Sequence, residues 1–87
     1  MTRVAVVDPQ PALRAGLVMM LRAEPGMVPV GAAAGAGDGH ALLVRERPDV
    51  VLLEPRLLDG DGVALCRRIR AELPDTRVVL YTAQPDD

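Results

Sequence analysis

The sequence predicts an α/β fold, a three-layer, doubly wound parallel sheet built as βαβαβαβ. Short Val- and Leu-rich runs that are almost continuously apolar alternate along the chain with segments of helical spacing. Continuous apolar runs are typical of strands that are buried on both faces. Alternation of strand and helix implies right-handed crossovers and a parallel sheet with helices on its faces.

The composition fits one small globular domain and excludes several classes of protein. The chain has 87 residues, of which 49% are apolar and 25% charged. Its net charge is −2, which gives no general reason to bind nucleic acid. A single cysteine, Cys66, excludes an internal disulfide. Without a membrane-length apolar run or a signal-peptide pattern, we expect a cytoplasmic domain with no membrane or nucleic-acid partner.

The predicted strands are short, and one of them carries a proline. Pro29 cannot donate a hydrogen bond to a neighbouring strand, so the second strand should lie at an edge of the sheet. The four strands are expected at residues 4–7, 27–32, 50–53 and 78–81.

The helices are predicted from apolar spacing and from proline at their ends. Pro11 suits the first position of a helix over residues 11–23, whose buried face would hold Leu13, Leu17, Met20 and Leu21. A second helix is expected at residues 39–47, with Asp38 as its N-cap. The Ala/Gly-rich residues 31–39 before it should form a flexible connection.

The third helix is expected at residues 62–73, capped by Asp61 and ended by Pro74. Its buried stripe would consist of Leu65, Ile69 and Leu73.

Two acids and a hydroxyl follow the predicted strands, at the edge of a parallel sheet where function usually gathers. Asp8 follows the first strand, Glu54 the third and Thr82 the fourth. Two carboxylates can hold Mg²⁺, and a nearby hydroxyl can bond to a phosphoryl oxygen. The alternative is structural: the acids cap loops or face solvent, and Thr82 merely ends a strand.

Several motifs together resemble the receiver domain of bacterial two-component response regulators, of the type that precedes a helix-turn-helix output domain. The resemblance covers the whole chain and implies a flavodoxin-like, receiver-like sheet with strand order 2-1-3-4, in which the second strand, with Pro29, lies at an edge. Its most specific carriers are the Arg-Pro-Asp run before the third strand and the Thr-Ala pair after the fourth. The motifs are Arg3-Val-Ala-Val-Val-Asp8, Leu13-Arg-Ala-Gly-Leu17, Arg47-Pro-Asp-Val-Val-Leu-Leu-Glu54, Asp59-Gly-Asp-Gly62, Arg67-Arg-Ile-Arg70 and Val78-Val-Leu-Tyr-Thr-Ala83.

The resemblance implies a Mg²⁺ site and a phosphoacceptor, but this chain departs from the family at most of the implied positions. Pro9 stands where a second acid is usual, beside Asp8. Glu54 occupies the position of the phosphoaccepting Asp, and Leu58 stands where proline is usual in the following loop. Thr82 matches the family's switch hydroxyl. The family's Lys, which follows a fifth strand, has no counterpart.

These departures predict a degenerate site. Pro9 removes a negative charge, so Mg²⁺ held by Asp8 and Glu54 would bind weakly or be lost. The extra methylene of Glu54 moves its carboxylate outward, and a misplacement of about 1 Å can cost on the order of 10²-fold in rate. Without the Lys, nothing neutralises a transferred phosphoryl group from that side.

We therefore expect a non-enzymatic signalling module of a transcriptional regulator that works without phosphorylation. Its expected partners are proteins, namely an output domain and a histidine kinase. Two alternatives stay open: a working Mg²⁺-dependent phosphoacceptor in a phosphorelay, and a flavodoxin-like module that binds a small ligand. A sharper hypothesis is that the Glu54 carboxylate imitates a phosphoryl group.

The predicted strand at residues 78–81 has a further consequence. Compared with the family, residues 1–87 lack the fourth helix, the fifth strand and the fifth helix. This strand would then be a bare apolar edge, which invites pairing with another chain. We expect either a fragment of a longer protein or a chain that forms a homodimer through this edge.

Other conspicuous residues are expected to be structural. Three glycines in the second connection have the wrong spacing and place for a nucleotide loop, and no Lys accompanies them. One histidine and one cysteine lack evident partners for chemistry. An arginine cluster on the third helix is expected to be a solvated face. These residues are Gly35, Gly37, Gly39, His40, Cys66, Arg67, Arg68 and Arg70.

Overall fold

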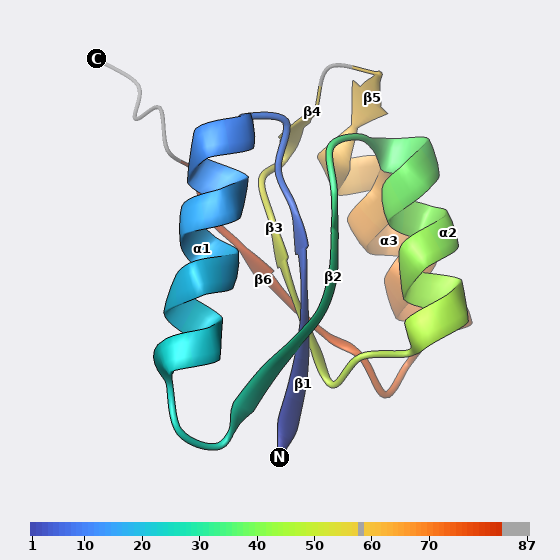
Figure 1. Cartoon of the computed structure of the whole chain (residues 1–87). Helices are drawn as coiled ribbons and strands as arrows, with labels where there is room; N and C mark the ends of the chain where they lie inside the picture. The colour runs from blue at the N-terminus through green and yellow to red at the C-terminus, as the bar shows by residue number, and fades with distance from the viewer. Residues whose placement is uncertain (58, 83–87) are drawn as a thin grey trace.

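A four-stranded parallel sheet with the order β2-β1-β3-β6 forms the centre of the molecule (Figure 1). The computed structural model describes residues 1–57 and 59–82. This order is the predicted one, since β6 is the fourth strand of the sheet along the chain. The strands are β1 (Thr2–Val7), β2 (Met27–Ala33), β3 (Val50–Leu53) and β6 (Arg77–Leu80).

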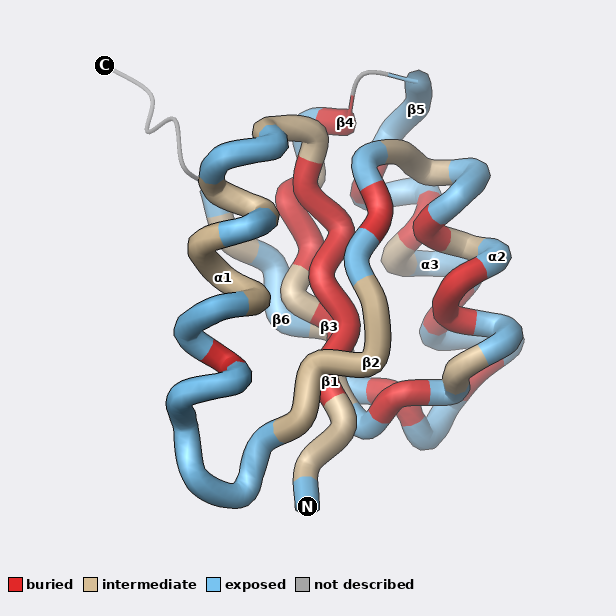
Figure 2. Tube along the Cα trace, viewed as in Figure 1, coloured by how far each residue is buried: buried red, intermediate tan, exposed pale blue. Residues whose placement is uncertain are grey.

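Helices cover both faces of the sheet and complete the predicted three layers. Helix α1 (Pro11–Ala23) lies on one face, and α2 (Ala36–Glu46) and α3 (Gly62–Glu72) lie on the other (Figure 1). Alternate residues of β1 pack on opposite faces of the sheet. Val4 and Val6 pack with α1, whereas Ala5 and Val7 join the larger core under α2 and α3. Strands β1 and β3 are therefore the buried centre of the molecule (Figure 2).

The edge strand β2 carries Pro29, as predicted. Its pairing with β1 shifts register between Val4 and Ala5, so that Val30 is an extra residue in β2. Directly after this bulge, Gly31 lies against α2: a Cβ atom there would come within 2.5 Å of Leu42 Cδ1. A proline, a bulge and a close contact thus shape this edge together.

The predicted start of the second helix and the flexible connection before it are both wrong. Strand β2 continues to Ala33 and α2 begins at Ala36, so Asp38 lies inside the first turn. The cap comes from another part of the chain. Asp59 Oδ1 accepts a hydrogen bond from the Ala36 backbone N–H at 2.7 Å, and Oδ2 accepts one from Gly37 at 3.4 Å. The bond from Ala36 is the main reason why the pKa of Asp59 is lowered.

The third helix follows the prediction closely, whereas one residue of the first helix does not. Asp61 caps α3 and accepts a hydrogen bond from Val63 N–H at 2.8 Å, and the predicted stripe of Leu65, Ile69 and Leu73 is buried. Met20, however, is 68% exposed because α1 packs through Leu21 and its neighbours Leu17 and Val18.

A short antiparallel hairpin, which the sequence pattern did not indicate, lies between β3 and α3. It pairs β4 (Arg56–Leu57) with β5 (Gly60–Asp61). Leu58 lies outside the described residues. Within residues 1–57 and 59–82, no helix combines the length and apolar character needed to cross a lipid bilayer.

The Arg-Pro-Asp run makes contacts at the end of the sheet where β1 and β3 begin. Arg47 ends α2 in the left-handed conformation, with φ 45°, and Pro48 is buried. Asp49 Oδ2 then accepts a hydrogen bond from the Arg3 backbone N–H at 2.7 Å. Arg3 in turn reaches Glu46 with its guanidinium group, at 3.1 Å from Oε1. These contacts hold the starts of β1 and β3 side by side.

Two glycines offer a matched test of the packing. A Cβ atom at Gly62 would come within 2.5 Å of Pro55 Cα, whereas one at Gly16 within α1 meets nothing within 4 Å. We expect Gly62→Ala to lower the free energy of unfolding by about 1–3 kcal/mol through overpacking. Gly16→Ala should raise it by about 0.5–1 kcal/mol, because alanine loses less backbone entropy in a helix. Denaturant unfolding measures both; a neutral Gly62→Ala variant would contradict the described contact with Pro55.

Candidate functional site

Asp8 and Glu54 lie side by side at the carboxyl edge of the sheet, as the sequence predicted. They directly follow Val7 and Leu53, which are partners in the β1–β3 pairing. The Glu54 backbone N–H donates to Val7 O at 3.0 Å and so extends this pairing by one step. Both acids are buried: Asp8 is 0% and Glu54 4% exposed. Two negative charges thus lie close together with little access to water.

Both carboxylate oxygens of Asp8 accept hydrogen bonds from the protein. Oδ1 accepts from the Gln10 backbone N–H at 2.7 Å, and Oδ2 accepts from the hydroxyl of Tyr81 in a short hydrogen bond. The Arg14 side chain donates to the Asp8 carbonyl oxygen at 2.7 Å and brings a positive charge to this edge. Hydrogen bonds to a carboxylate stabilise its charged form, which would otherwise be costly to bury.

Tyr81 reaches Asp8 because its backbone is held beside β3. Its N–H donates to Leu53 O at 3.1 Å, one residue before Glu54. Partial burial raises the pKa of the Tyr81 hydroxyl above its ordinary value of 10. The hydrogen bond to Asp8 and the negative charges of Asp8 and Glu54 act in the same direction, because they disfavour the tyrosinate.

Glu54 is held by the loop that follows it. Its Oε1 accepts a hydrogen bond from the Arg56 backbone N–H at 2.9 Å, where β4 begins. Pro55, between them, accepts a hydrogen bond from Gly62 N–H at 3.0 Å, which ties this loop to the start of α3. The carboxylate is therefore a buried, oriented acceptor.

Thr82 follows Tyr81 at the same edge and is exposed. The fold thus brings all three predicted site residues to one edge, where Asp8 and Glu54 lie buried and Thr82 lies at the surface. Ala83, the other half of the Thr-Ala motif, lies outside the described residues.

Receiver domains generally bind Mg²⁺ at the phosphorylation site, but the residues described here do not fit that ion. Mg²⁺ needs several oxygen ligands in octahedral geometry and keeps some of its waters. Asp8 has both oxygens engaged by protein donors, and Pro9 supplies no second acid. In the described part of the chain, no three His, Cys, Asp or Glu side chains gather so that they could hold a metal.

Sequence patterns missed the two side chains that complete this site. Tyr81 belongs there only to the end of the fourth predicted strand and to a motif, and Arg14 only to a motif. The position of Tyr81 next to Thr82 could have indicated its role, because a long side chain at the end of a strand can reach residues that follow the neighbouring strands. The reach of Arg14 to Asp8 depends on how α1 packs, which apolar spacing does not specify.

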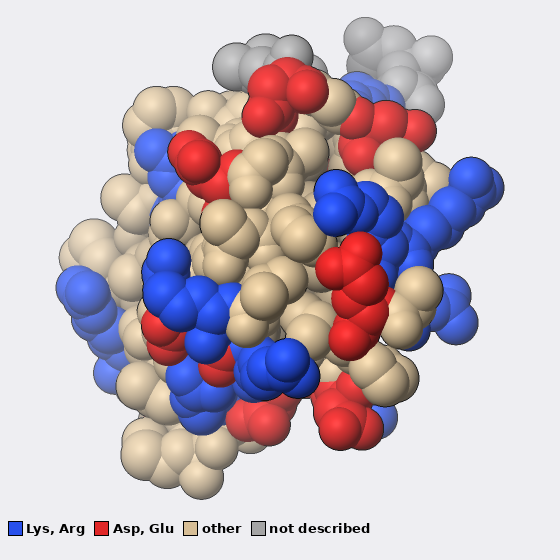
Figure 3. All heavy atoms as spheres, turned by 90° about the vertical axis from the view of Figure 1, so that its right-hand side faces the viewer, with Lys and Arg blue, Asp and Glu red and all other residues tan. Residues whose placement is uncertain are grey.

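The remaining conspicuous residues have structural surroundings. His40 Nε2 lies 2.7 Å from Glu72 Oε1 and links α2 to α3. Cys66 packs against the larger core, and Gly39 lies close to Val7. Basic and acidic side chains are interspersed over the face formed by α2 and α3 (Figure 3). This mixture lacks the continuous basic surface typical of nucleic-acid binding.

Comparisons with known proteins agree with this fold. The chain is 38% identical over 87 residues to the DNA-binding transcriptional activator DevR/DosR of Mycobacterium tuberculosis, covering 100% of this chain and 40% of that protein. It is 32% identical to the transcriptional regulatory protein LiaR of Bacillus subtilis, covering 41% of it. A protein-glutamate methylesterase of Anaeromyxobacter dehalogenans is 40% identical over 86 residues, and the chain covers 25% of it. The chain thus spans less than half of each relative.

Solved structures show the same arrangement. The signal receiver domain of the putative response regulator NarL from Mycobacterium tuberculosis superposes with a TM-score of 0.88 at 34% identity, covering 98% of this chain and 68% of that one. A LuxR-family response regulator from Aurantimonas sp. SI85-9A1 gives 0.89 at 28% identity, covering 98% and 61%. The family model of the response regulator receiver domain matches residues 4–87. The chain therefore belongs to the response regulator receiver domain family.

Proposed function

We propose that this receiver domain transmits its signal without being phosphorylated, as part of a bacterial transcriptional regulator. The main support for the proposal is the set of hydrogen bonds that the protein donates to the carboxylates of Asp8 and Glu54. Asp8 accepts from Gln10 and Tyr81, and Glu54 accepts from Arg56. We propose that the chain is part of a transcriptional regulator because two of its relatives are named as transcriptional regulators.

Phosphoryl transfer to a carboxylate depends on position and on charge neutralisation. The acceptor oxygen must be open to the donor, and a cation must offset the charge that gathers on the phosphoryl group. Glu54 is 4% exposed and one methylene longer than aspartate. A nucleophile displaced by about 1 Å can lose on the order of 10²-fold in rate.

The site is equally poorly suited to bind the Mg²⁺ ion that phosphoryl transfer needs. The Tyr81 hydroxyl approaches Asp8 Oδ2, where a cation would have to approach, and Pro9 leaves Asp8 without a neighbouring acid. A neutral hydroxyl satisfies the carboxylate but cannot offset the charge of a phosphoryl group. The proposed site roles are therefore Asp8 as a structural anchor, Glu54 at the vestigial acceptor position and Thr82 as an exposed hydroxyl beside them.

The proposed partners are an output domain and a histidine kinase, since receiver domains of response regulators interact with both. We propose that recognition uses protein surfaces and not nucleic acid, because charges of both signs alternate on the face of α2 and α3 (Figure 3). We also propose that residues 1–87 act as a non-catalytic receiver-like unit.

Incubation with acetyl phosphate and Mg²⁺, followed by intact mass measurement, tests the proposal. We expect the unmodified chain to keep its mass, while an active receiver domain in the same assay gains one phosphoryl group. Glu54→Asp alone should also stay unmodified, because Pro9 and Tyr81 still withhold the metal. A phosphoryl adduct on the unmodified chain that disappears in Glu54→Gln would overturn the proposal in favour of a working phosphoacceptor.

The same Glu54 variants decide whether its carboxylate imitates a phosphoryl group. If it does, Glu54→Gln should change amide chemical shifts around Thr82 and the end of β6, while Glu54→Asp should produce a smaller change in the same direction. Shifts confined to Glu54 and Arg56 in both variants would exclude the mimic hypothesis.

Titration of Tyr81 tests the network directly, because this is the sole tyrosine of the chain. Its pKa is raised in the folded state, so the folded chain holds the phenolic proton more tightly than the unfolded chain. This contribution to stability is fully present below the unfolded pKa of about 10 and is lost as pH rises through the folded pKa. Near-ultraviolet absorbance should show tyrosinate forming at a distinctly higher pH than in the unfolded chain, whose midpoint lies near pH 10, and unfolding stability should fall above pH 10.

Asp8→Asn is the control for this titration, since it removes the charge and keeps the size of the side chain. We expect the pKa of Tyr81 to fall toward its ordinary value in this variant. An ordinary tyrosine titration in the unmodified chain would show that the bond to Asp8 is absent in solution.

A further inference from the structure

A cleft of about 360 Å³ lies beside the end of β2. Strand β2 is an edge of the sheet, with α1 on one face and α2 on the other (Figure 1). Residues 32–34, all alanine, form the floor of the cleft, and their small side chains leave its space open. Charged side chains of both helices surround this floor. The lining residues that matter here are Arg14 of α1 and Asp38, Ala41 and Arg45 of α2.

The floor of the cleft offers backbone groups for hydrogen bonding. Asp8 N–H donates to Ala33 O at 3.0 Å, so the backbone groups of Ala33 point toward β1. Successive residues of a strand point their backbone groups in opposite directions, so the N–H and C=O groups of Ala32 point away from β1. Residues 1–57 and 59–82 place no strand on that side of β2. Ala32, which is exposed, therefore presents one donor and one acceptor to the cleft.

Only the end of β2 is suited to pair with a further strand. Pro29 has no backbone N–H, and Val30 is the extra residue of the bulge, so the first half of β2 cannot continue a regular ladder. From Gly31 to Ala33 the register with β1 is unbroken. A segment that paired here would be short, and its side chains would have to contribute much of the binding.

Two arginines approach the cleft from opposite faces of the sheet. Arg14 donates through one terminal nitrogen to the Asp8 carbonyl oxygen at 2.7 Å, which is a neutral acceptor and not a carboxylate. Arg45 reaches Glu46 with Nε at 3.2 Å, and its side chain is 66% exposed. A guanidinium group has five N–H donors. Both arginines therefore keep donors for a further, negatively charged acceptor.

We propose that this cleft binds an extended acidic segment of a partner protein, which pairs with Ala32 as an additional strand. Successive side chains of a strand point to opposite faces of a sheet. Two adjacent acidic residues of the segment would therefore point one toward Arg14 and the other toward Arg45. Arginine binds a carboxylate through two parallel hydrogen bonds, which makes both residues suited to this role.

Asp38 determines which further groups fit the cleft. It is exposed and lies in the first turn of α2, and Arg45 lies roughly 10 Å further along the same helix. An acidic group of the segment fits beside Arg45, and a basic or amide group fits beside Asp38. Two positive charges and one negative charge leave the cleft positive, although the whole chain has a net charge of −2. The cleft therefore favours an acidic segment over a basic one.

An acidic segment bound here would supply one of the protein contacts proposed above for signalling. Its binding does not depend on whether Glu54 accepts a phosphoryl group. The mass measurement on Glu54 and the binding experiment on this cleft can therefore fail separately.

Nuclear magnetic resonance titration with the capped peptide acetyl-Thr-Val-Glu-Glu-Val-Thr-amide tests the cleft. We expect saturable changes at the amides of Ala32, Ala34 and Ala41, and slower hydrogen exchange at Ala32. The contact is much smaller than a standard interface, so Kd should be about 0.1–1 mM. The same peptide with two glutamines in place of the glutamates should bind about tenfold more weakly. No saturable change at these amides with millimolar peptide would overturn the proposal.

Acetate distinguishes a protein segment from a free carboxylate. At the same concentration it should leave the hydrogen exchange of Ala32 unchanged, because it cannot pair with the strand. Equal effects of acetate and peptide at this amide would show a site for a small anion and would contradict the docking of a strand.

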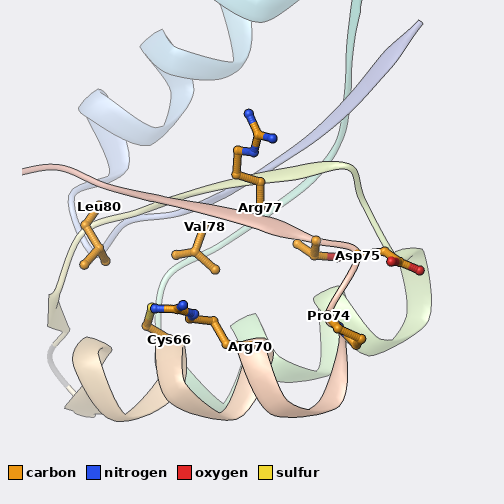
Figure 4. Close-up of a pocket in the computed structure, with 8 residues that line it drawn as sticks. Cys66, Arg70, Pro74, Asp75, Arg77, Val78 and Leu80 are labelled. Carbon is orange, nitrogen blue, oxygen red and sulfur yellow. The ribbon is translucent and has the colours of Figure 1, made fainter.

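Three variants localise the contact. Arg45→Gln should weaken peptide binding about tenfold, whereas Arg70→Gln should not. Arg70 is a matched control, since both arginines are exposed and lie in the last turn of their helices. Arg70 lines a separate hollow between α3 and β6, with Cys66 and Val78 (Figure 4). Asp38→Asn should strengthen binding of the acidic peptide. Equal weakening by both arginine variants would mean that net charge alone attracts the peptide and would overturn the proposed site.

Discussion

The buried carboxylate of Asp8 imposes the constraint on which the carboxyl edge of this sheet depends. A carboxylate without access to water must be stabilised by donors or by a cation. Here Gln10 N–H and the Tyr81 hydroxyl donate to its two oxygens, and Arg14 adds a positive charge beside its carbonyl group. The bond to Tyr81 also links the end of β6 to the end of β1, although β3 lies between the two strands.

We propose that this network has a structural role at the position where receiver domains are phosphorylated. Glu54, beside Asp8, is oriented by Arg56 and by a loop that Gly62 holds through Pro55. In the proposed function, the same contacts that lower the cost of burying the acids oppose phosphoryl transfer, and the domain signals through protein contacts.

Sequence patterns predicted the parallel sheet with helices on its faces and the meeting of Asp8 with Glu54, because these follow from apolar runs and parallel topology. The strand order followed from the resemblance to receiver domains, which the edge position of Pro29 fits. The patterns failed where a contact joins residues far apart in the chain. The start of α2 depends on Asp59, whose carboxylate replaces the cap expected from Asp38. Met20 fits the helical stripe but is exposed and lines a groove with Leu52. The role of Tyr81 depends on the direction of its side chain, which spacing does not encode.

The central claim, that Tyr81 and not a cation satisfies Asp8, has a direct spectroscopic test. Tyr81 is the sole aromatic residue, so its emission reports on this hydrogen bond without interference from other residues. A phenol bonded to a carboxylate emits weakly, and a cation that displaced the phenol would increase the emission. Titration with Mg²⁺ to millimolar concentrations should leave the emission unchanged at constant ionic strength. A saturable increase that Asp8→Asn abolishes would show that Mg²⁺ binds Asp8 and would contradict this account.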